Sequence, residues 1–318
     1  MSTLLVIGGS GFFGKSILSA FQRGLLTPWE ITSIKVLART ASKLRLEHPE
    51  LLNAAIELID SDIAQCKTLP EADFVIHAAA STDISRYLAE PIEEQKNIQA
   101  SILNYCKLAP LYHSNAKIIY ASSGAIYGPQ PAETPFLTES SPLGEITKMV
   151  EGKQHYAAAK RDAEMAIQEL GIAGLSVSIA RCFAFVGPYL PRDQHFAIGN
   201  FIEDGLCGRP IKVNANKLVY RSYMYADDLV EWLMTIAAAS NTQCPIFNVG
   251  SDEAIEMRDI ALTVAHFFEV EVAAPKITDT GVDRYVPSID SAFTVLGLVN
   301  KHDLASSIYE TVKQIRGA

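Results

Sequence analysis

Leu4-Leu5-Val6-Ile7, followed directly by Gly8-Gly9-Ser10-Gly11-Phe12-Phe13-Gly14, is the stretch that decides the fold of this 318-residue chain. A short apolar run ends in a glycine turn, and apolar residues at helical spacing come next. Gly8, Gly11 and Gly14 keep a three-residue spacing. That spacing suits a tight turn, a close approach of pyrophosphate to the backbone, and close packing of a helix on a strand. The stretch predicts a dinucleotide-binding strand–turn–helix unit.

Apolar runs and helical segments alternate through the first half of the chain. Near-continuous apolar strands separated by helices predict a parallel sheet covered on both faces. The expected strands are Leu4–Gly8, Ile34–Ala38, Ile56–Ile59, Phe74–Ala80, Lys117–Ala121 and Leu175–Ala180, and the expected helices include Gly14–Arg23 and Ile92–His113. We therefore expect an α/β fold, a Rossmann-type doubly wound parallel sheet with a smaller α/β substrate-binding lobe at the C-terminus.

A loop rich in Pro, Ser and Glu at 128–144 and a second break at 188–191 interrupt this rhythm. Beyond them we expect helices at Phe196–Cys207, Asp228–Ala239, Met257–Phe268 and from Leu304, and strands at Ile211–Val213, Val219–Tyr225 and Phe247–Val249. We assign residues 1–181, with about 219–249, to a dinucleotide-binding domain. Residues 182–218 and 250–318 are assigned to the smaller lobe.

The composition excludes several classes of partner. A net charge of −9 and a pI of 5.3 argue against nucleic acid or an acidic membrane surface. The five cysteines are scattered, with no Cys-x-x-Cys and no metal-ligand spacing, so we expect reduced thiols and no metal site. The chain has no basic leader and no apolar run of about 18 residues. We expect a soluble, unprocessed, cytoplasmic protein.

Tyr156-Ala157-Ala158-Ala159-Lys160 is the candidate catalytic segment. It lies among strong helix formers, so Lys160 comes over the same face as Tyr156 one turn later. An adjacent ammonium favours the phenolate, and we expect the pKa of Tyr156 to fall from about 10 toward neutrality. Tyr156 would then serve as an acid/base for a hydroxyl or carbonyl group. A Tyr and a Lys one turn apart occur on many helices, so the pair does not decide the matter alone.

The end of the second strand bears on the choice of cofactor. NAD-binding folds usually carry an acidic residue there for the ribose hydroxyls. This chain has Arg39 and, a few residues later, Lys43, either of which could hold a 2′-phosphate. A solvated basic loop is the other interpretation. We expect NADP(H) to be favoured, with NAD(H) possible.

Together these residues resemble the extended short-chain dehydrogenase/reductase family, the NAD-dependent epimerase/dehydratase group that modifies nucleotide sugars. The resemblance covers nearly the whole chain. Its carriers are Gly8–Gly14, Asp62-Ile63, His77–Ala80, Asn97, Tyr120–Gly128, Tyr156 with Lys160, Ala180–Pro188, Arg221–Leu229, Phe247–Ser251 and Asp283–Ser288.

The resemblance implies specific roles for these positions. The catalytic residues would be Ser123, Tyr156 and Lys160, with Ser123 binding the substrate oxygen and Lys160 acting on Tyr156 and on the nicotinamide ribose. The cofactor-binding residues would be Gly8, Gly11, Phe12, Phe13, Gly14, Arg39, Lys43, Asp62, Ile63, Ala78, Ala79, Ala80, Asn97, Ala121, Tyr156 and Lys160. The substrate-binding residues would be Ser81, Ser123, Arg221 and Arg284. Family members commonly form homodimers through the helices around Ile98 and Tyr156.

Two departures from the family pattern narrow the function. Family dehydratases carry an Asp-Glu pair directly after the catalytic Ser or Thr, whereas this chain has Gly124 and Ala125, which cannot titrate. This argues against a 4,6-dehydratase. Many members place an Asn before the Gly-Pro, against the substrate phosphate, and here Ala184 stands in that place. The residues that bind the substrate phosphate must therefore differ from those of such members.

These features favour an NAD(P)-dependent oxidoreductase for a nucleotide-diphosphate sugar. The first hypothesis is reduction of a 4-keto-6-deoxy sugar by hydride transfer, with Tyr156 as proton donor. The alternative is an NAD-dependent C4 epimerase, which uses the same residues without net redox change. A third class is a non-enzymatic cofactor sensor on the same fold. Such proteins often lose the Tyr or the Lys, and both are present here with Ser123.

Overall fold

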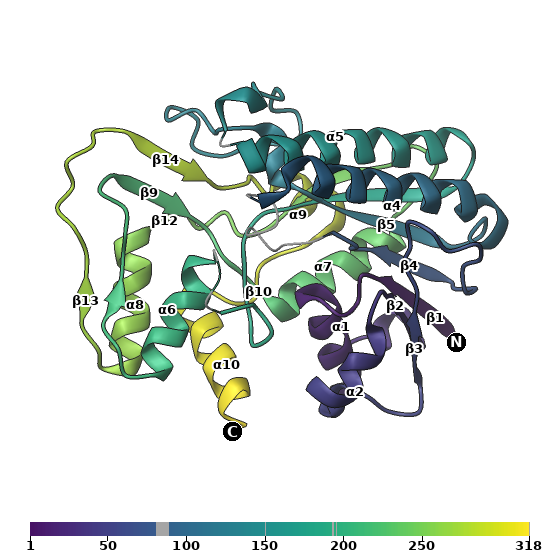
Figure 1. The fold of residues 1–318 in the computed structure, drawn as a ribbon, viewed down its shortest axis with the longest axis horizontal. Helices are drawn as coiled ribbons and strands as arrows, with labels where there is room; N and C mark the ends of the chain where they lie inside the picture. The colour runs from purple at the N-terminus through teal and green to yellow at the C-terminus, as the bar shows by residue number, and fades with distance from the viewer. Residues whose placement is uncertain (81–88, 150, 193, 195, 318) are drawn as a thin grey trace. The chain divides into compact units, whose positions relative to one another are not determined.

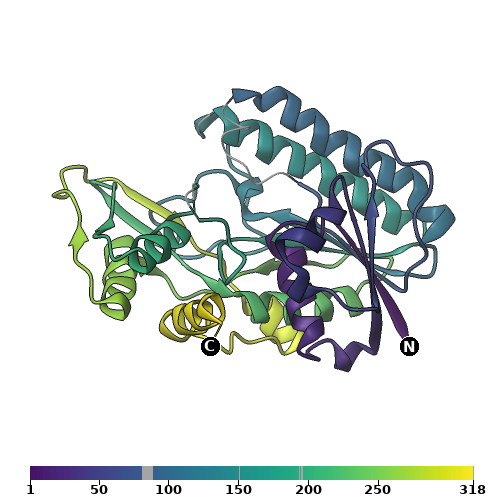
Figure 2. The same cartoon turned by 60° about the horizontal axis from the view of Figure 1, so that its bottom comes forward.

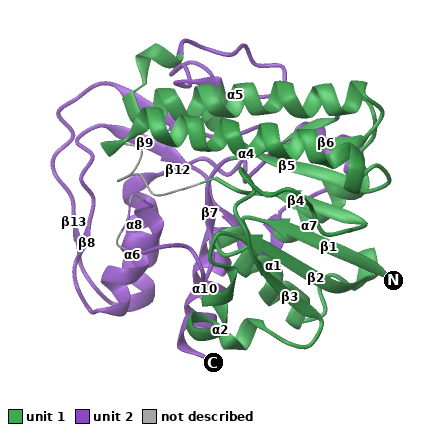
Figure 3. Ribbon diagram, turned by 45° about the vertical axis from the view of Figure 1, so that its right-hand side comes forward, with its two compact units in different colours: residues 1–126, 146–182, 230–247 green, residues 127–145, 183–229, 248–318 purple. Residues whose placement is uncertain are grey.

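The structure, a computed structural model, describes residues 1–80, 89–149, 151–192, 194 and 196–317. Its two compact units are coloured in Figure 3: residues 1–126, 146–182 and 230–247 form unit 1, and residues 127–145, 183–229 and 248–318 form unit 2. The division expected from the sequence differs at 127–145, 219–229 and 248–249, which group with unit 2, and at 182, which groups with unit 1. What each part binds stays a prediction.

Unit 1 is built on a seven-stranded sheet in the order β11-β6-β5-β4-β1-β2-β3, and the pairings from β3 through β6 are parallel. Its strands are β1 (Ser2–Ile7), β2 (Ile31–Ala38), β3 (Ile56–Asp60), β4 (Phe74–His77), β5 (Lys117–Ser123), β6 (Ser176–Cys182) and β11 (Ile246–Val249). Its helices are α1 (Phe12–Gln22), α2 (Leu44–Glu47), α4 (Pro91–Tyr112), α5 (Glu151–Ile172) and most of α7 (Ala226–Ala238). The doubly wound Rossmann-type sheet is confirmed.

Both faces of this sheet are covered. In Figures 1 and 2, α4 and α5 lie side by side along one face, and α1 and α7 lie along the other. Leu5, Val75 and Ile118 on the strands pack with Tyr105 of α4 and Ile167 of α5 in the main apolar core. Every one of these side chains is fully buried, which explains why the strands read as continuous apolar runs.

The strand order reverses beside β1, which pairs with β2 on one side and β4 on the other. Open α/β sheets bind ligands at such a switch point, outside the carboxyl ends of the strands. The glycine turn follows β1 and Ala78–Ala80 follows β4, so both segments lie at this edge. The sequence predicted a strand through Ala80, but β4 ends at His77, and the Ala78 N–H donates to the Ile7 carbonyl (2.8 Å).

Unit 2 is made of shorter elements. Its strands are β7 (Phe185–Val186), β8 (Ile211–Lys212), β9 (Leu218–Arg221), β10 (Met224–Tyr225), β12 (Ile255–Glu256), β13 (Val272–Ala273) and β14 (Val282–Tyr285). Its helices are α6 (Ala197–Leu206), α8 (Met257–Phe268), α9 (Asp290–Leu296) and α10 (Leu304–Arg316). A three-stranded sheet, β12-β9-β14, packs against α8, and α6 and α10 pack on α8 in turn.

The predicted strand Val219–Tyr225 is two strands in the structure. β9 ends at Arg221, and β10 begins at Met224 in a different sheet, paired with β7. Ser222 and Tyr223 between them are buried, so the segment looks like one apolar strand in the sequence although the chain changes sheets there. Within the described residues, no helix combines the length and the apolar character that crossing a membrane requires.

Candidate active site

The glycine turn after β1 has the shape that a pyrophosphate cradle requires. Gly8 has φ +85°, and a Cβ there would lie 2.6 Å from the Ala79 Cα, so the turn packs directly on the segment after β4. A Cβ on Gly14 would lie 2.0 Å from the Gly9 carbonyl oxygen. At Gly11, the residue before α1, the nearest atom would be 3.7 Å away, so this side of the turn is open. An open helix N-terminus of this kind fits a dinucleotide phosphate.

The other predicted cofactor residues frame this edge of the sheet. Phe12 and Phe13 open α1 with their rings 5.8 Å apart, and Ala78, Ala79 and Ala80 are half-buried beside the turn. Asp62 closes its own loop, since the Ala64 N–H donates to Asp62 Oδ1 (3.0 Å). Its neighbour Ile63 is buried in the core, and Asn97 lies exposed on α4. The roles assigned to these side chains stay predictions.

Arg39 and Lys43 are exposed just after β2, and neither side chain has an ion pair or hydrogen bond in the described structure. An acidic residue does lie nearby, at the end of β3: Asp60 Oδ1 accepts the Ser42 N–H (2.8 Å). Hydrogen bonds from Ser42 hold the pKa of this carboxyl below its ordinary value. The loop therefore has two free cations and one ionised carboxylate.

Ser123, Tyr156 and Lys160 come together at the carboxyl end of β5. Ser123 ends that strand and hydrogen-bonds Tyr156. Lys160 is buried on α5, where its Nζ donates to the Ala121 carbonyl (2.7 Å) and lies 5.8 Å from the centroid of the Tyr156 ring. The same Nζ lies 4.7 Å from the centroid of the Tyr120 ring. The predicted three-residue constellation is present, and Ala121 contributes to it through its backbone carbonyl.

The expected fall in the pKa of Tyr156 is wrong. Burial raises the pKa of Tyr156 to about 12, and the hydrogen bond from Ser123 offsets only part of this. Lys160 is buried as well, and burial lowers the pKa of its ammonium to about 8. Desolvation is the largest influence on the pKa of both groups, and the Lys160 ammonium donates its hydrogen bond to the Ala121 carbonyl. Tyr156 is therefore a neutral phenol that still holds its proton.

Comparison with known proteins gives these features a family. The model of the NAD dependent epimerase/dehydratase family matches residues 4–250. The chain belongs to this family. It is an extended short-chain dehydrogenase/reductase, as the resemblance implied, and an enzyme of that type. UDP-glucuronic acid decarboxylase 6 of Arabidopsis thaliana is 27% identical over 306 residues, covering 92% of this chain and 83% of that protein.

Solved structures of the same fold agree with this assignment. The Thermus thermophilus UDP-glucose 4-epimerase in complex with NAD is 25% identical, with a TM-score of 0.77 over 99% of each chain. The Bacillus anthracis dTDP-glucose 4,6-dehydratase in complex with NAD has a TM-score of 0.80 at 18% identity, over 100% of this chain and 97% of that one. The second match shows the fold alone.

The two arginines expected to bind substrate lie in the three-stranded sheet of unit 2, in neighbouring rows. Arg284 of β14 is opposite Tyr220 of β9, and its guanidinium lies 4.3 Å from the centroid of that ring. Arg221 is opposite Tyr285, and its Nη1 is 3.1 Å from Asp283 Oδ1. Because adjacent residues of a strand point to opposite faces, Arg221 and Arg284 point away from each other. The other predicted substrate residue, Ser81, lies outside the described residues.

Sequence reasoning missed a buried polar cluster beside Lys160. Glu164 accepts a hydrogen bond from Ser122 Oγ (2.5 Å) and an ion pair from Arg181, whose Nη2 lies 2.9 Å from Glu164 Oε2. All three side chains are buried in this family member. The signal was in the spacing: Tyr156, Lys160 and Glu164 follow at intervals of four, so they share one helix face.

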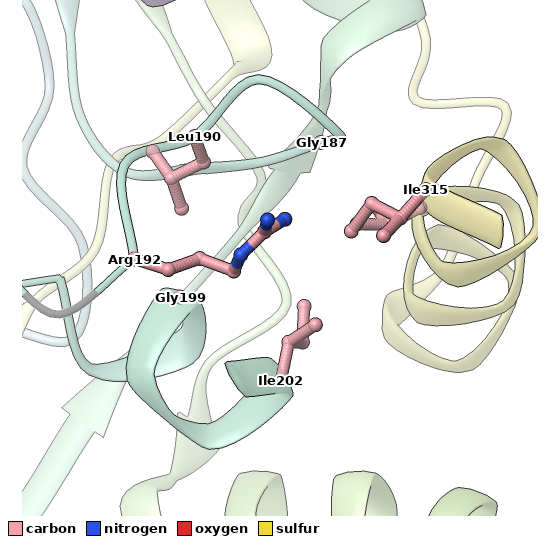
Figure 4. Close-up of a pocket in the computed structure, with 7 residues that line it drawn as sticks. Gly187, Leu190, Arg192, Gly199, Ile202 and Ile315 are labelled. Carbon is pink, nitrogen blue, oxygen red and sulfur yellow. The ribbon is translucent and has the colours of Figure 1, made fainter. Parts of the chain in front are cut away.

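Two further hollows lie away from these residues. In the pocket of Figure 4, Arg192 points between Leu190 and Ile315, its Nε lies 2.7 Å from Glu203, and no space remains for a water molecule. A cavity of about 350 Å³ lies against Leu37 and Ile59 below the loop that follows β3. Among the described residues, no three His, Cys, Asp or Glu side chains gather in a way that could hold a metal ion.

Proposed function

We propose that this chain is an NAD(P)-dependent oxidoreductase that reduces a 4-keto-6-deoxy sugar attached to a nucleoside diphosphate. The observation that carries the proposal is a neutral Tyr156 that is hydrogen-bonded to Ser123 and lies next to Lys160, while Gly124 and Ala125 follow Ser123 directly after the end of β5. This set can deliver one proton to a carbonyl oxygen. It has no second acid or base where family dehydratases keep theirs, which favours carbonyl reduction over elimination.

The chain's own residues handle the proton and the oxygen. Ser123 hydrogen-bonds the carbonyl oxygen, and the Tyr156 hydroxyl gives that oxygen its proton as the alcohol forms. The Lys160 ammonium then stabilises the phenolate that remains, because Lys160 is buried and Tyr156 is half-buried beside it. The glycine turn would hold the pyrophosphate of the cofactor, and a bound NAD(P)H would supply the hydride to the carbonyl carbon. Burial raises the pKa of Tyr156 and so opposes loss of its proton. The positive charge of Lys160 compensates for this when the phenolate forms.

Nucleotide-diphosphate sugars are the proposed substrate class for two reasons: relatives in the family act on such sugars, and Arg221 can bind a diphosphate. The Arabidopsis decarboxylase and the Thermus epimerase both act, by name, on UDP-linked sugars. Arg221 is the better diphosphate ligand of the two arginines. Its Nη1 is anchored by Asp283 and by the Tyr220 carbonyl (2.8 Å), which leaves the rest of the guanidinium fork available and held in one orientation. Arg284 is occupied in stacking on Tyr220.

NADPH is the proposed cofactor of the reductive direction. Arg39 and Lys43, two exposed cations with no partner among the residues that the structure describes, follow β2, where a 2′-phosphate would lie. Asp60 opposes this preference from β3. Titration of the cofactor-free protein with NADPH and NADH, followed by cofactor fluorescence, tests the assignment directly. Tighter binding of NADH would overturn it.

A C4 epimerase is the second candidate, favoured by the match to the NAD-bound Thermus epimerase. Three assays on purified protein separate the possibilities. A 4-ketoreductase consumes one NADPH for each keto-sugar reduced. An epimerase interconverts UDP-glucose and UDP-galactose with no net change in cofactor absorbance. Release of CO₂ from UDP-glucuronic acid would instead give this chain the activity by which its Arabidopsis relatives are named, and would overturn both candidates.

We also propose that the protein is a cytoplasmic homodimer. Support for a dimer comes from α4 and α5, whose outer faces expose Leu103 (61%), Leu111 (74%), Met165 (58%) and Ile172 (78%). Large apolar side chains gathered on neighbouring helices are typical of a protein interface. Light scattering of the eluting protein should give twice the 34.7 kDa chain mass. A mass equal to one chain would contradict the dimer.

A further inference from the structure

Successive residues at the end of β5 bind successive turns of α5. Ser123 hydrogen-bonds Tyr156, the Ala121 carbonyl accepts from Lys160 Nζ (2.7 Å), and Ser122 Oγ donates to Glu164 Oε1 (2.5 Å). The first two of these contacts hold proposed catalytic groups. The third holds Glu164, one turn beyond Lys160 on the same helix face, for which the proposed reaction has no step.

Burying the carboxylate of Glu164 costs free energy, because the charge loses its contact with water. It is 6% exposed, and its compensation comes from Arg181 on β6, which is 7% exposed. Arg181 donates to both carboxylate oxygens, from Nε to Oε1 (3.1 Å) and from Nη2 to Oε2 (2.9 Å). Buried ion pairs add little net stability compared with apolar packing of the same volume. Packing alone therefore does not account for a carboxylate at this position.

We propose that Glu164, held by Ser122 and Arg181, is a positioning residue that fixes the turn of α5 carrying Lys160 and keeps Lys160 positively charged during the reaction.

Among the groups that face Lys160, Glu164 is the negative charge that opposes the effect of burial on the pKa of Lys160. Burial lowers the pKa of Lys160 to about 8, and Cys182 and, less strongly, Glu164 raise it. Burial also keeps the neighbouring groups neutral: it raises the pKa of Tyr156 and of the Cys182 thiol to about 12, and lowers the pKa of His77 to about 3. The groups facing Lys160 are Tyr156 and Glu164 on α5, Tyr120 on β5, Cys182 on β6 and His77 on β4, with Arg181 behind Glu164.

The inference rests on the proposed role of Lys160 beside Tyr156, so its test reads Lys160 without substrate or cofactor. The full-length protein is labelled with ¹³Cε-lysine, and the Lys160 signal is assigned by its loss in Lys160→Met. Its chemical shift is then followed from pH 6 to 10. In the wild type the midpoint is expected near 8. If the proposed sugar chemistry is wrong, this titration is unaffected, so the two failures are distinguishable.

Two variants should move the midpoint in opposite directions. Glu164→Gln keeps the shape and an acceptor for Ser122 but removes the negative charge, and it should lower the midpoint by about one pH unit. Arg181→Gln leaves the Glu164 charge unbalanced and should raise it. A general loss of structure does not produce shifts of opposite sign. Glu169→Gln, an exposed carboxylate on the same helix, is the matched control and should leave the midpoint unchanged.

A double variant covers the case in which a single change prevents folding. Glu164→Gln with Arg181→Met removes both buried charges, and whole replacement of such a pair is often tolerated. The midpoint should still fall, because Glu164 is the partner one turn from Lys160. An unchanged midpoint in every folded variant that lacks the Glu164 charge overturns the proposal.

Kinetics give a second readout. The alkaline limb of the kcat profile should move toward lower pH in Glu164→Gln by the same amount as the NMR midpoint, about tenfold in rate on that limb, with KM unchanged. Glu164→Asp retains the charge and should restore most of the limb. Ser122→Ala should lower stability while leaving the limb in place. Equal losses in all three variants at every pH would mean a purely structural role and would contradict the proposal.

Discussion

Two regions of the molecule differ in how far their charged side chains are buried. One is the end of β5 together with α5 in unit 1, and the other is the β12-β9-β14 sheet of unit 2. In the first region Lys160, Glu164 and Arg181 are buried, and each has a named partner. In the second, Arg221 and Arg284 are partly exposed and lie on opposite faces of a small sheet. In the proposed function, burial controls the chemistry of the first region, whereas a partly exposed Arg221 in the second binds the ligand.

This difference separates the consequences of mutation. A buried group in low dielectric interacts strongly with its neighbours, so its loss should change rate constants and pH profiles. A partly exposed arginine interacts through a screened charge, so its loss should change ligand affinity. The predictions below test whether the two regions divide kcat and KM in this way.

The largest effect is expected at Tyr156. Tyr156→Phe removes the proton donor but leaves the ring and the helix, so kcat should fall by about 10³-fold. Binding of NAD(P)H, measured by fluorescence titration, should change little. Tyr120→Phe is the matched control, because it removes a hydroxyl from a buried ring that also faces Lys160. Near-normal turnover in Tyr156→Phe would contradict the proposed mechanism.

The glycine turn offers a second contrast within unit 1. Gly14→Ala places a Cβ 2.0 Å from the Gly9 carbonyl oxygen and should lower the free energy of unfolding by about 3 kcal/mol, as overpacking does. Gly11→Ala has its nearest neighbour at 3.7 Å, so stability in urea should be nearly unchanged. Its methyl group would instead occupy the open side of the turn and weaken cofactor binding. Equal stabilities for the two variants would contradict this cradle.

The sequence predicted unit 1 better than unit 2 for a physical reason. Strands buried on both faces are continuous apolar runs, and the helices α1, α4 and α5 are long enough to show their period. In unit 2, β12 and β13 have two residues each, too few for any alternation. Neither was predicted, and β14 was also missed. The Val219–Tyr225 run, predicted as one strand, crosses from one sheet to another.

The site shows the same limit. Ser123, Tyr156 and Lys160 were identified by their spacing and family resemblance, and the structure brings them together. The pKa of Tyr156 was predicted in the wrong direction, because charge can be read from a sequence but the extent of desolvation cannot. Arg221 and Arg284 were both predicted to bind substrate, and only the register of β9 with β14 shows that they point apart.

Arg221 should matter more than Arg284 for substrate affinity. Arg221→Met should raise KM for a nucleotide sugar about 10- to 100-fold with little change in kcat, the range for a hydrogen bond to a charged group. Arg284→Met should change KM much less and should instead lower thermal stability through loss of its contact with Tyr220. Binding of UDP alone, measured by calorimetry, should follow the same order. Equal losses in both variants would mean that both arginines reach one diphosphate.

The smallest effect is expected at the loop after β2. The charges of this loop in unit 1 are exposed, like the partly exposed arginines of unit 2. Arg39→Ala should weaken NADPH binding about three- to fivefold and leave NADH unchanged, because exposed charge pairs contribute little and salt screens them. Asp60→Asn removes the opposing carboxylate and should strengthen NADPH binding. Both changes should shrink as salt rises from 50 to about 500 mM, which distinguishes a screened surface charge from a buried contact. If Arg39→Ala weakened NADPH binding equally at low and high salt, Arg39 would interact as a buried charge does. That result would contradict the proposed difference between exposed and buried charges.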